Sequence, residues 1–424
     1  MRIDKVNILN FFLLFSILAS SQNNTRSPYS LNELGEINFL GNVSSVSMGG
    51  VESSLDSIEF NINNPSSLAK LKTTNYQIGT FYKSTGISNG ALTDRYNSAN
   101  INYVAIGIPV KNFGFGFGVL PYSSTGFSLQ SSESYNDVNS IGSRLFYADG
   151  NVNRAFLSAG ISLTKTISIG ATINYNFGKF SYEMFNQYDE VSYGIYSSSS
   201  SEISGFNYNL SSSFTIPLND ELLINLVYNY HPSNNLKSFN TQSIFTTTSS
   251  IINVESLGDF VDIDLESRQL QNTSLNIPKK SVYSIGLEKK NNWFVGVQFE
   301  DKLSSSFENR FLDIKNVSYR DSKVLSFGGY LIPDATSLTS YWKRVKYRFG
   351  IKNEEKSIIV NNLPVNHFIL NLGLGLPLSG LSKANFGLEF GKIGNDKNTI
   401  EESYFAMRLG LSLNDVWFIK RKYN

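Results

Sequence analysis

Hydrophobic and polar residues alternate along much of the chain with a period of two. From Ile167 to Phe177, every second residue is Ile, Ala, Tyr or Phe, and the residues between them are Ser, Gly, Thr and Asn. Residues 403–413 repeat this alternation with Phe, Met and Leu on one face. A period of two is typical of a β-strand whose two faces meet different environments, because a helix would repeat every 3.6 residues. The pattern predicts strands that separate an apolar medium from a polar one.

Segments with this alternation recur from residue 74 to the end of the chain. They predict strands near 74–82, 99–109, 113–122, 153–163, 167–177, 204–216, 221–230, 281–289, 292–300, 323–332, 345–353, 366–376, 384–391 and 403–413. Single-chain bacterial barrels have an even number of strands, and closure satisfies every backbone group in the bilayer. The fold class is therefore all-β, a transmembrane antiparallel β-barrel of about 14 strands. A soluble β-sandwich or propeller is the alternative.

The connections between the predicted strands alternate between short and long. Short turns fall at 111–112, 164–166, 219–220 and 290–291, and long connections span 124–152, 178–203 and 231–280. Outer-membrane barrels have short periplasmic turns and long external loops, so both ends of the barrel are expected in the periplasm. The 231–280 connection contains β-like residues and is expected to extend strands above the membrane or cap the outer mouth. It is the first candidate for a ligand or partner contact.

The first residues and the composition agree with export to the outer membrane of a Gram-negative cell. Residues 1–21 combine two basic residues, an apolar run and small residues, which is typical of a signal peptide. The chain has no cysteine, which excludes disulfides, thiol catalysis and a lipidated cysteine. Its 31 Phe, 23 Tyr and 17% charged residues suit a barrel, and a net charge of +1 offers no surface for nucleic acid. Aromatic residues at strand ends are predicted to form interfacial girdles, at Tyr82, Tyr122, Tyr228, Tyr230, Trp293 and Tyr404.

Residues 22–72 lack alternation and are rich in Ser, Asn and Gly. Such a segment could fold into the lumen as a hatch or remain a disordered periplasmic tail. It contains Ser47-Met48-Gly49-Gly50-Val51, then Asp56, then Asn64-Pro65-Ser66-Ser67-Leu68. These motifs resemble the N-terminal hatch of the FadL-type outer-membrane barrels, which carry long-chain fatty acids and other hydrophobic molecules.

The resemblance implies a plugged lumen, a hydrophobic ligand path and lateral release through the wall. It also implies ligand or gating roles for Met48, Gly49, Gly50, Asp56, Asn64 and Pro65. The expected domains are a signal peptide at 1–21, a hatch at 22–72, a barrel at 73–413 and a basic periplasmic tail at 414–424. The chain is expected to turn at Asn414-Asp415, which departs from barrels that close on an aromatic residue.

Charged residues also fall on the predicted inner faces of the strands. The basic candidates for ligand contact are Arg154, Lys346, Arg348 and Arg408, and acidic residues on inner faces include Glu288, Glu300 and Glu389. One interpretation is a lumen that attracts an anionic head group such as a carboxylate. The other interpretation is that Arg and Glu side chains brace one another across the pore.

No motif of an enzyme or of a resident cofactor stands out. His231 and His367 lie far apart in the chain, and neither has a carboxylate pair at metal-ligand spacing, so no metal site or Ser-His-Asp triad is expected. The glycine-rich run from Gly114 lacks the Lys-Ser/Thr of a phosphate-binding loop. The sequence therefore predicts a protein that is not an enzyme and needs no cofactor.

Two functions remain open at this point. The leading one is a passive, hatch-gated channel for hydrophobic small molecules of the fatty-acid kind, with outer-membrane lipid and such a molecule as partners. The rival, which some relatives of the FadL type represent, is a structural or docking barrel of a protein secretion machine associated with type IX secretion. That barrel would contact secretion-system proteins and transport nothing itself. A general porin ranks third, because a hatch would obstruct it.

Overall fold

The computed structural model describes residues 25–31, 34–90, 93–134, 141–188, 193–247, 260–312, 317–394 and 400–415. The predicted signal peptide and residues 416–424 of the predicted basic tail lie outside these ranges. Within them, no helix has the length and apolar character that crossing a bilayer requires.

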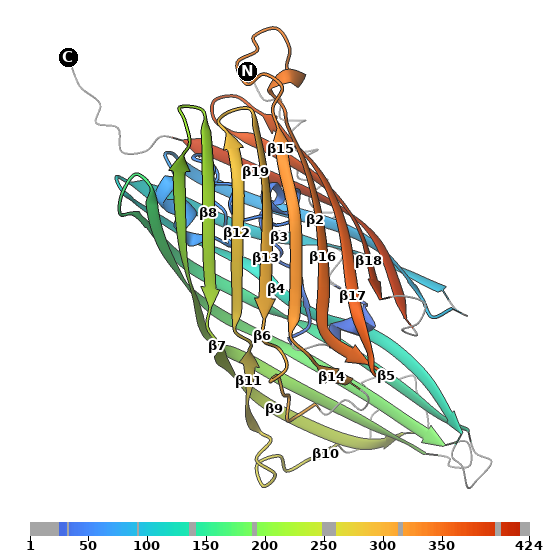
Figure 1. Cartoon of the computed structure of the whole chain (residues 1–424). Coiled ribbons are helices and arrows are strands. Elements are labelled where there is room, and N and C mark those ends of the chain that lie inside the picture. The colour runs from blue at the N-terminus through green and yellow to red at the C-terminus, as the bar shows by residue number, and fades with distance from the viewer. Residues whose placement is uncertain are drawn as a thin grey trace, which may run out of the picture.

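A closed antiparallel barrel of fourteen strands dominates the structure (Figure 1). Its strands are β2 (Thr74–Ser88), β3 (Thr93–Val110), β4 (Phe113–Ser134), β5 (Ile141–Ser162), β6 (Ile167–Tyr188), β7 (Gly194–Pro217), β8 (Leu222–His231), β12 (Lys280–Lys289), β13 (Trp293–Lys302), β15 (Ser322–Leu331), β16 (Lys346–Val360), β17 (Leu363–Pro377), β18 (Lys383–Gly394) and β19 (Glu401–Asp415). The last strand pairs with the first along its whole length and closes the sheet. Each predicted segment coincides with one of these strands, which confirms the fold class and the strand count.

The two faces of the wall differ as the alternation predicted. On β6, Ile169 and Ile173 are exposed, whereas Ser168 and Thr172, the residue before each of them, are buried. The exposed apolar face is the one that meets lipid, and the small polar face lines the lumen. The girdle prediction was wrong for Tyr122 and Tyr404, because their positions in the alternation place both side chains on the lumenal face. Tyr82 and Tyr228 do lie on the exposed face.

The long connections are largely ordered as extensions of the strands, which are visible at the lower end of Figure 1. β4 to β7 have 22 to 24 residues each, whereas about 9–11 suffice to cross a bilayer. Beyond Pro232, β9 (Asn234–Thr247) continues beside β7, and β11 (Asn272–Ile277) pairs with β9. The prediction that the 231–280 connection extends strands is therefore confirmed. Two short strands, β10 (Val261–Asp262) and β14 (Val317–Tyr319), add to these extensions by pairing with β9 and β16.

The end of the last strand corrects one prediction. The chain does not turn at Asn414 and Asp415, because β19 continues through both residues, opposite Asn75 and Thr74 of β2. The Asn75 amide donates a hydrogen bond to the side-chain oxygen of Asn414 over 3.0 Å. Pairing with the first strand thus extends the last strand by two residues.

The N-terminal segment lies inside the barrel, and we call its residues 25–73 the hatch. It contains η1 (Pro28–Leu31), β1 (Glu36–Ile37), α2 (Val43–Val46) and η2 (Pro65–Lys70). η2 contacts β4 to β7, and α2 contacts β17 to β19 on the opposite wall. A segment that touches opposite walls fills the lumen, as the blue elements within the barrel of Figure 1 show.

Candidate functional site: the hatch and the lumen

Glycines on the inner faces of the strands bring the hatch against the backbone of the wall. A Cβ added to Gly114 would lie 2.1 Å from the carbonyl oxygen of Leu68, and one added to Gly328 would lie 2.1 Å from that of Met48. An added Cβ would also meet hatch atoms at twelve further wall glycines. Two of these, Gly126 and Gly394, meet Thr25 and Tyr29 near the start of the hatch. The other ten, together with Gly114 and Gly328, form what we call the glycine ring: Gly107, Gly116, Gly160, Gly170, Gly286, Gly296, Gly350, Gly373, Gly387 and Gly410. At most of these positions even an alanine would displace hatch or wall. The ring therefore sets a close fit on eleven of the fourteen strands.

The first motif residues form part of this close fit. Gly49 and Gly50 have φ angles of +70° and +85°, which a residue with a side chain rarely adopts. A Cβ on Gly49 would lie 3.2 Å from the backbone oxygens of Phe327 and Ile351. Met48 is buried in an apolar cluster against β13 and β15. The structure brings Met48, Gly49 and Gly50 together as packing contacts between hatch and wall.

Asn64 and Pro65 shape the other side of the hatch. The Asn64 side-chain oxygen accepts hydrogen bonds from the backbone N–H of Ser66 over 3.1 Å and from its hydroxyl over 2.7 Å. It thereby caps η2, and Pro65 fills the first position, where a missing N–H costs nothing. Because η2 rests on Gly160 and Gly170, the motif positions that helix against β5 and β6.

Asp56 binds the hatch to the basic wall. Its carboxylate lies 3.2 Å from Nζ of Lys346 and 3.0 Å from Nζ of Lys383, and it accepts the backbone N–H of Ile58 over 3.1 Å. Burial favours the protonated acid, but the two lysines outweigh burial and hold the pKa of Asp56 well below its usual range. Lys383 was missed in the sequence, although it shares the alternation of Asn385, Gly387 and Glu389 on β18. We call Asp56, Lys346 and Lys383 the latch.

A second hatch carboxylate, Glu59, also meets a basic wall residue. The Asn385 amide donates to Glu59 over 3.3 Å, and its side-chain oxygen accepts Nη1 of Arg348 over 3.0 Å. The hydroxyl of Ser44 also donates to Glu59. Arg348 is therefore bound indirectly to the hatch through Asn385. No sequence signal marks Glu59, because it lies in a segment without periodicity.

Arg408 is braced within the wall. Its Nε lies 3.1 Å from a carboxylate oxygen of Glu389, and both side chains are almost completely buried. The Tyr404 hydroxyl donates to the other oxygen of Glu389 over 3.0 Å and lies 2.9 Å from Nε2 of His367. This geometry favours the bracing interpretation for Arg408.

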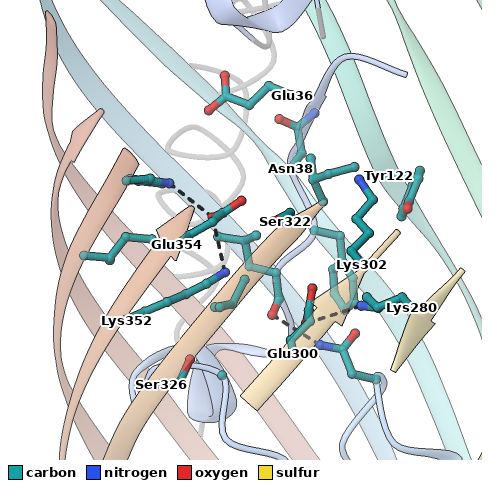
Figure 2. Close-up of a pocket in the computed structure, with 18 of the residues that line it drawn as sticks. Glu36, Asn38, Tyr122, Lys280, Glu300, Lys302, Ser322, Ser326, Lys352 and Glu354 are labelled. Carbon is teal, nitrogen blue, oxygen red and sulfur yellow. Dashed lines mark hydrogen bonds and ion pairs between the residues drawn. The ribbon is translucent and has the colours of Figure 1, made fainter. Parts of the chain in front are cut away.

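Between the hatch and the wall, the lumen contains a cavity of about 260 Å³. Figure 2 shows Lys280 beside Glu300 and Lys352 beside Glu354, with nitrogen to oxygen distances of 3.6 Å and 3.7 Å. Apolar side chains, including Phe39, Ile62, Phe81, Leu120, Phe156 and Ile277, complete the lining. The cavity is thus amphipathic, with charged and apolar sides.

Arg154 differs from the other candidates. Its guanidinium carbon lies 3.5 Å from the centre of the Tyr122 ring, and its Nε donates to the side chain of Asn176 over 2.8 Å. Among the residues that the structure describes, no carboxylate forms an ion pair with it. Arg154 lines the same cavity.

The wall is incomplete between β3 and β4. These strands pair only from Val104 to Val110, and β3 carries a bulge at Asn102, just beyond that pairing. The hatch supplies a partner for the β4 edge: Glu36 and Ile37 pair with Ser124 and Ser123. The Lys83 ammonium of β2 lies 2.7 Å from Glu36, and this partner contributes to holding the pKa of that buried carboxyl at about 2. The first part of the hatch therefore lines the opening in the wall.

No metal centre emerges from this geometry. Within the described ranges, no three His, Asp or Glu side chains gather closely enough to hold an ion.

A family model matches almost the whole chain, from residue 3 to residue 424, and its description reads BamG. The chain belongs to the BamG family. A search of curated proteins finds no match.

Solved structures of other barrels resemble this BamG family member in fold. A FadL homologue of Pseudomonas aeruginosa is 11% identical, with a TM-score of 0.61, over 88% of this chain and 97% of its own. The monoaromatic hydrocarbon channel CymD is 13% identical, with a TM-score of 0.57, over 90% and 98%. The toluene transporter TbuX of Ralstonia pickettii is 13% identical, with a TM-score of 0.55, over 91% and 99%. The expected likeness of the fold to FadL-type barrels is confirmed.

Proposed function

We propose that this BamG family member is a passive outer-membrane channel that admits small, largely apolar molecules to the cavity between the hatch and the wall. The observation that carries the proposal is this cavity, which lies in a barrel whose structural neighbours are channels for hydrophobic compounds. The cavity has apolar sides for a hydrocarbon such as toluene, and its charged side can also receive a polar group of a larger molecule. Movement of the hatch then opens the way onward, and the opening between β3 and β4 offers a sideways route.

The rival function rests on the glycine ring. A hatch that contacts inner-face glycines of eleven strands can also be a permanent filling of the lumen, which stiffens a barrel with a structural or docking role. In that case the lumen never opens, and the molecule acts through its surface. The two functions differ in one property, which is whether hatch movement controls uptake.

A reversible cross-link between hatch and wall tests this difference. The hydroxyls of Ser53 in the hatch and Ser284 in β12 lie 2.9 Å apart. Because the chain has no cysteine, the Ser53→Cys/Ser284→Cys pair gives a single defined disulfide. The assay is uptake of labelled toluene by Gram-negative cells that lack their own FadL-type barrels, under oxidising and reducing conditions. Each single-cysteine variant serves as a control.

If the channel is hatch-gated, the double-cysteine protein takes up toluene under reducing conditions and not under oxidising conditions. Uptake by each single-cysteine variant should be the same under both conditions. Uptake that continues through the oxidised protein would show that the hatch need not move, and would refute gating. A barrel that takes up no toluene in either state, with or without residues 22–72, would support the structural role.

A further inference from the structure

The outward face of the wall contains small side chains where β5 meets β6. Ala159 of β5 lies directly opposite Ala171 of β6, and both are exposed. Outward-facing pairs elsewhere in the wall combine large side chains, as Phe349 and Leu372 do between β16 and β17. An alanine side chain extends only one carbon from the backbone. The alanine pair therefore leaves a hollow in the apolar face of the wall.

Large side chains enclose this hollow and make it a groove of about 580 Å³. Its rim consists of apolar and aromatic side chains from β4 to β8, namely Phe113, Ile161, Ile169, Leu210, Tyr228 and Tyr230. Gly160 and Gly170 also line the groove, although their positions in the alternation face the lumen, so backbone forms part of its floor. The same two glycines carry η2 on the lumenal side. The groove and the seat of the hatch thus lie back to back on one layer of wall.

The groove opens on the side of the wall that meets lipid. Its rim residues Phe113 and Leu210 are each 47% exposed, and they continue the exposed apolar face that Ile173 shows on β6. Acyl chains of the bilayer therefore surround the groove. An empty hollow would forfeit the dispersion contacts of the atoms that line it, whereas an acyl chain restores them. The position of the groove thus selects a lipid chain as its occupant.

A cation lies at the end of the groove nearest the long extensions. The Lys279 ammonium is 5.5 Å from the centre of the Tyr230 ring, and Lys279 is exposed. β8 and β12 are antiparallel neighbours of ten residues each (Figure 1), and about 9–11 residues cross a bilayer. Tyr230 near the end of β8 and Lys279 just before β12 therefore lie at a membrane surface. Among the described residues no carboxylate forms an ion pair with Lys279, so its charge suits a lipid phosphate.

We propose that the groove binds one phosphorylated glycolipid of the lipid A type. An acyl chain lies over Ala159 and Ala171, and a phosphate contacts Lys279, with Tyr230 at the level of the head group. The outer leaflet supplies this lipid, because barrels carry their long connections on the outside of the cell and Lys279 lies at that end. The bound lipid completes the wall behind η2, which is a role separate from passage through the lumen.

The test is native mass spectrometry of the purified full-length barrel in a non-ionic detergent, titrated with bisphosphorylated, hexa-acylated lipid A. We expect one lipid A to bind per barrel. Lys279→Gln should weaken its affinity at least about tenfold, because a contact between ammonium and phosphate is charge-assisted. Ala171→Phe fills the floor of the groove and should weaken the affinity by at least as much, because the acyl chain loses its apolar contacts.

Each variant has a matched control on the outward face of another strand. Lys323→Gln removes an exposed lysine at the same end of β15, and Ala384→Phe enlarges a half-buried alanine that faces Leu376 and Leu411 around β18. Neither residue lines the groove, so both controls should bind lipid A as the wild type does. Circular dichroism checks that each variant is folded. Lys279→Gln leaves the packing of the wall intact and decides the question if Ala171→Phe does not fold.

Four results would overturn the proposal. The first is a wild-type barrel that binds no lipid A, and the second is one that binds phosphatidylglycerol or phosphatidylethanolamine equally tightly, since a phospholipid would then be the occupant. The third is unchanged affinity in folded Lys279→Gln or Ala171→Phe, or the same loss in their controls. The fourth is a barrel dimer that Ala171→Phe abolishes, since the groove would then hold a second copy. Lipid binding to the outer face and toluene uptake through the lumen are measured separately, so either can fail alone.

Discussion

The latch gives the sharpest prediction about the hatch. Among the described residues, Asp56 is the carboxylate that forms ion pairs with both Lys346 and Lys383, so Asp56→Asn leaves these two ammonium groups without it. The side chains are 25%, 14% and 17% exposed, respectively, so the site lies between surface and interior. Breaking a fully buried pair costs about 3–5 kcal/mol, and an exposed pair contributes about 1 kcal/mol or less. We therefore expect hatch docking to weaken by about 2–3 kcal/mol, since this site is intermediate.

At about 1.4 kcal/mol per tenfold, this loss raises the open fraction about 30- to 150-fold. The assay is conductance of single barrels in a planar bilayer, scored as the fraction of time spent open. Asp220→Asn, in the exposed turn between β7 and β8, is the control and should conduct as the wild type does. If Asp56→Asn opened no more often than Asp220→Asn, while deletion of residues 22–72 gave open barrels, the latch would not hold the hatch.

The pKa of Asp56 fixes how the latch responds to acid. A carboxyl whose pKa is lowered in the folded state stabilises that state above its unfolded pKa. The contribution is lost only as pH falls through the lowered value. The wild type should therefore stay closed at about pH 3, where an aspartate with its ordinary pKa of 3.8 would be mostly protonated, and opening at that pH would show that the lysines do not hold the Asp56 charge.

Three further predictions concern packing, titration and bracing. Gly328→Ala should loosen the hatch by about 1–3 kcal/mol through overpacking and increase proteolysis of the hatch, whereas Gly86→Ala, whose Cβ would meet nothing nearer than 3.8 Å, should not. Burial raises the pKa of Glu52 in the hatch to about 7, so protection of the hatch should weaken as pH rises from about 4.5 to 7, and Glu52→Gln should remove that dependence. Arg408→Gln leaves Glu389 buried and unpaired, so the thermal unfolding midpoint should fall by an amount equivalent to about 3–5 kcal/mol, and the added Glu389→Gln change should restore part of it.

The barrel could be predicted from the sequence because each strand of the wall shows its alternation of apolar and polar residues by itself. A strand with lipid on one side and a polar lumen on the other must alternate, and residues such as Ile169 and Ser168 show this without knowledge of the partner strand. Alternation did not predict the extensions of the strands. Above the membrane both faces of β7 carry serines, so alternation disappears although the strand continues to Gly194.

The contacts of the hatch could not be predicted, because they join segments that share no periodicity. The sequence shows that the inner faces of several strands consist of small residues, including glycine. A face of small residues can border either water or a tightly packed segment of chain. Only the path of the hatch shows that Gly114 meets Leu68 and Gly328 meets Met48. The motif residues were marked by resemblance, and their packing and capping roles became visible only in three dimensions.

The charged residues of the lumen show that alternation predicts which face of a strand a side chain lies on, but not which residue it pairs with. Alternation placed Lys346, Arg408 and Arg154 on inner faces, yet their side chains are long enough to reach a neighbouring strand, the hatch or open space. Lys346 acquires Asp56 only because the hatch passes its strand, and Arg408 acquires Glu389 only because β18 and β19 are in register. Arg154 receives no carboxylate from either source among the described residues. The electrostatic character of this lumen is therefore set as much by the route of the hatch as by the wall.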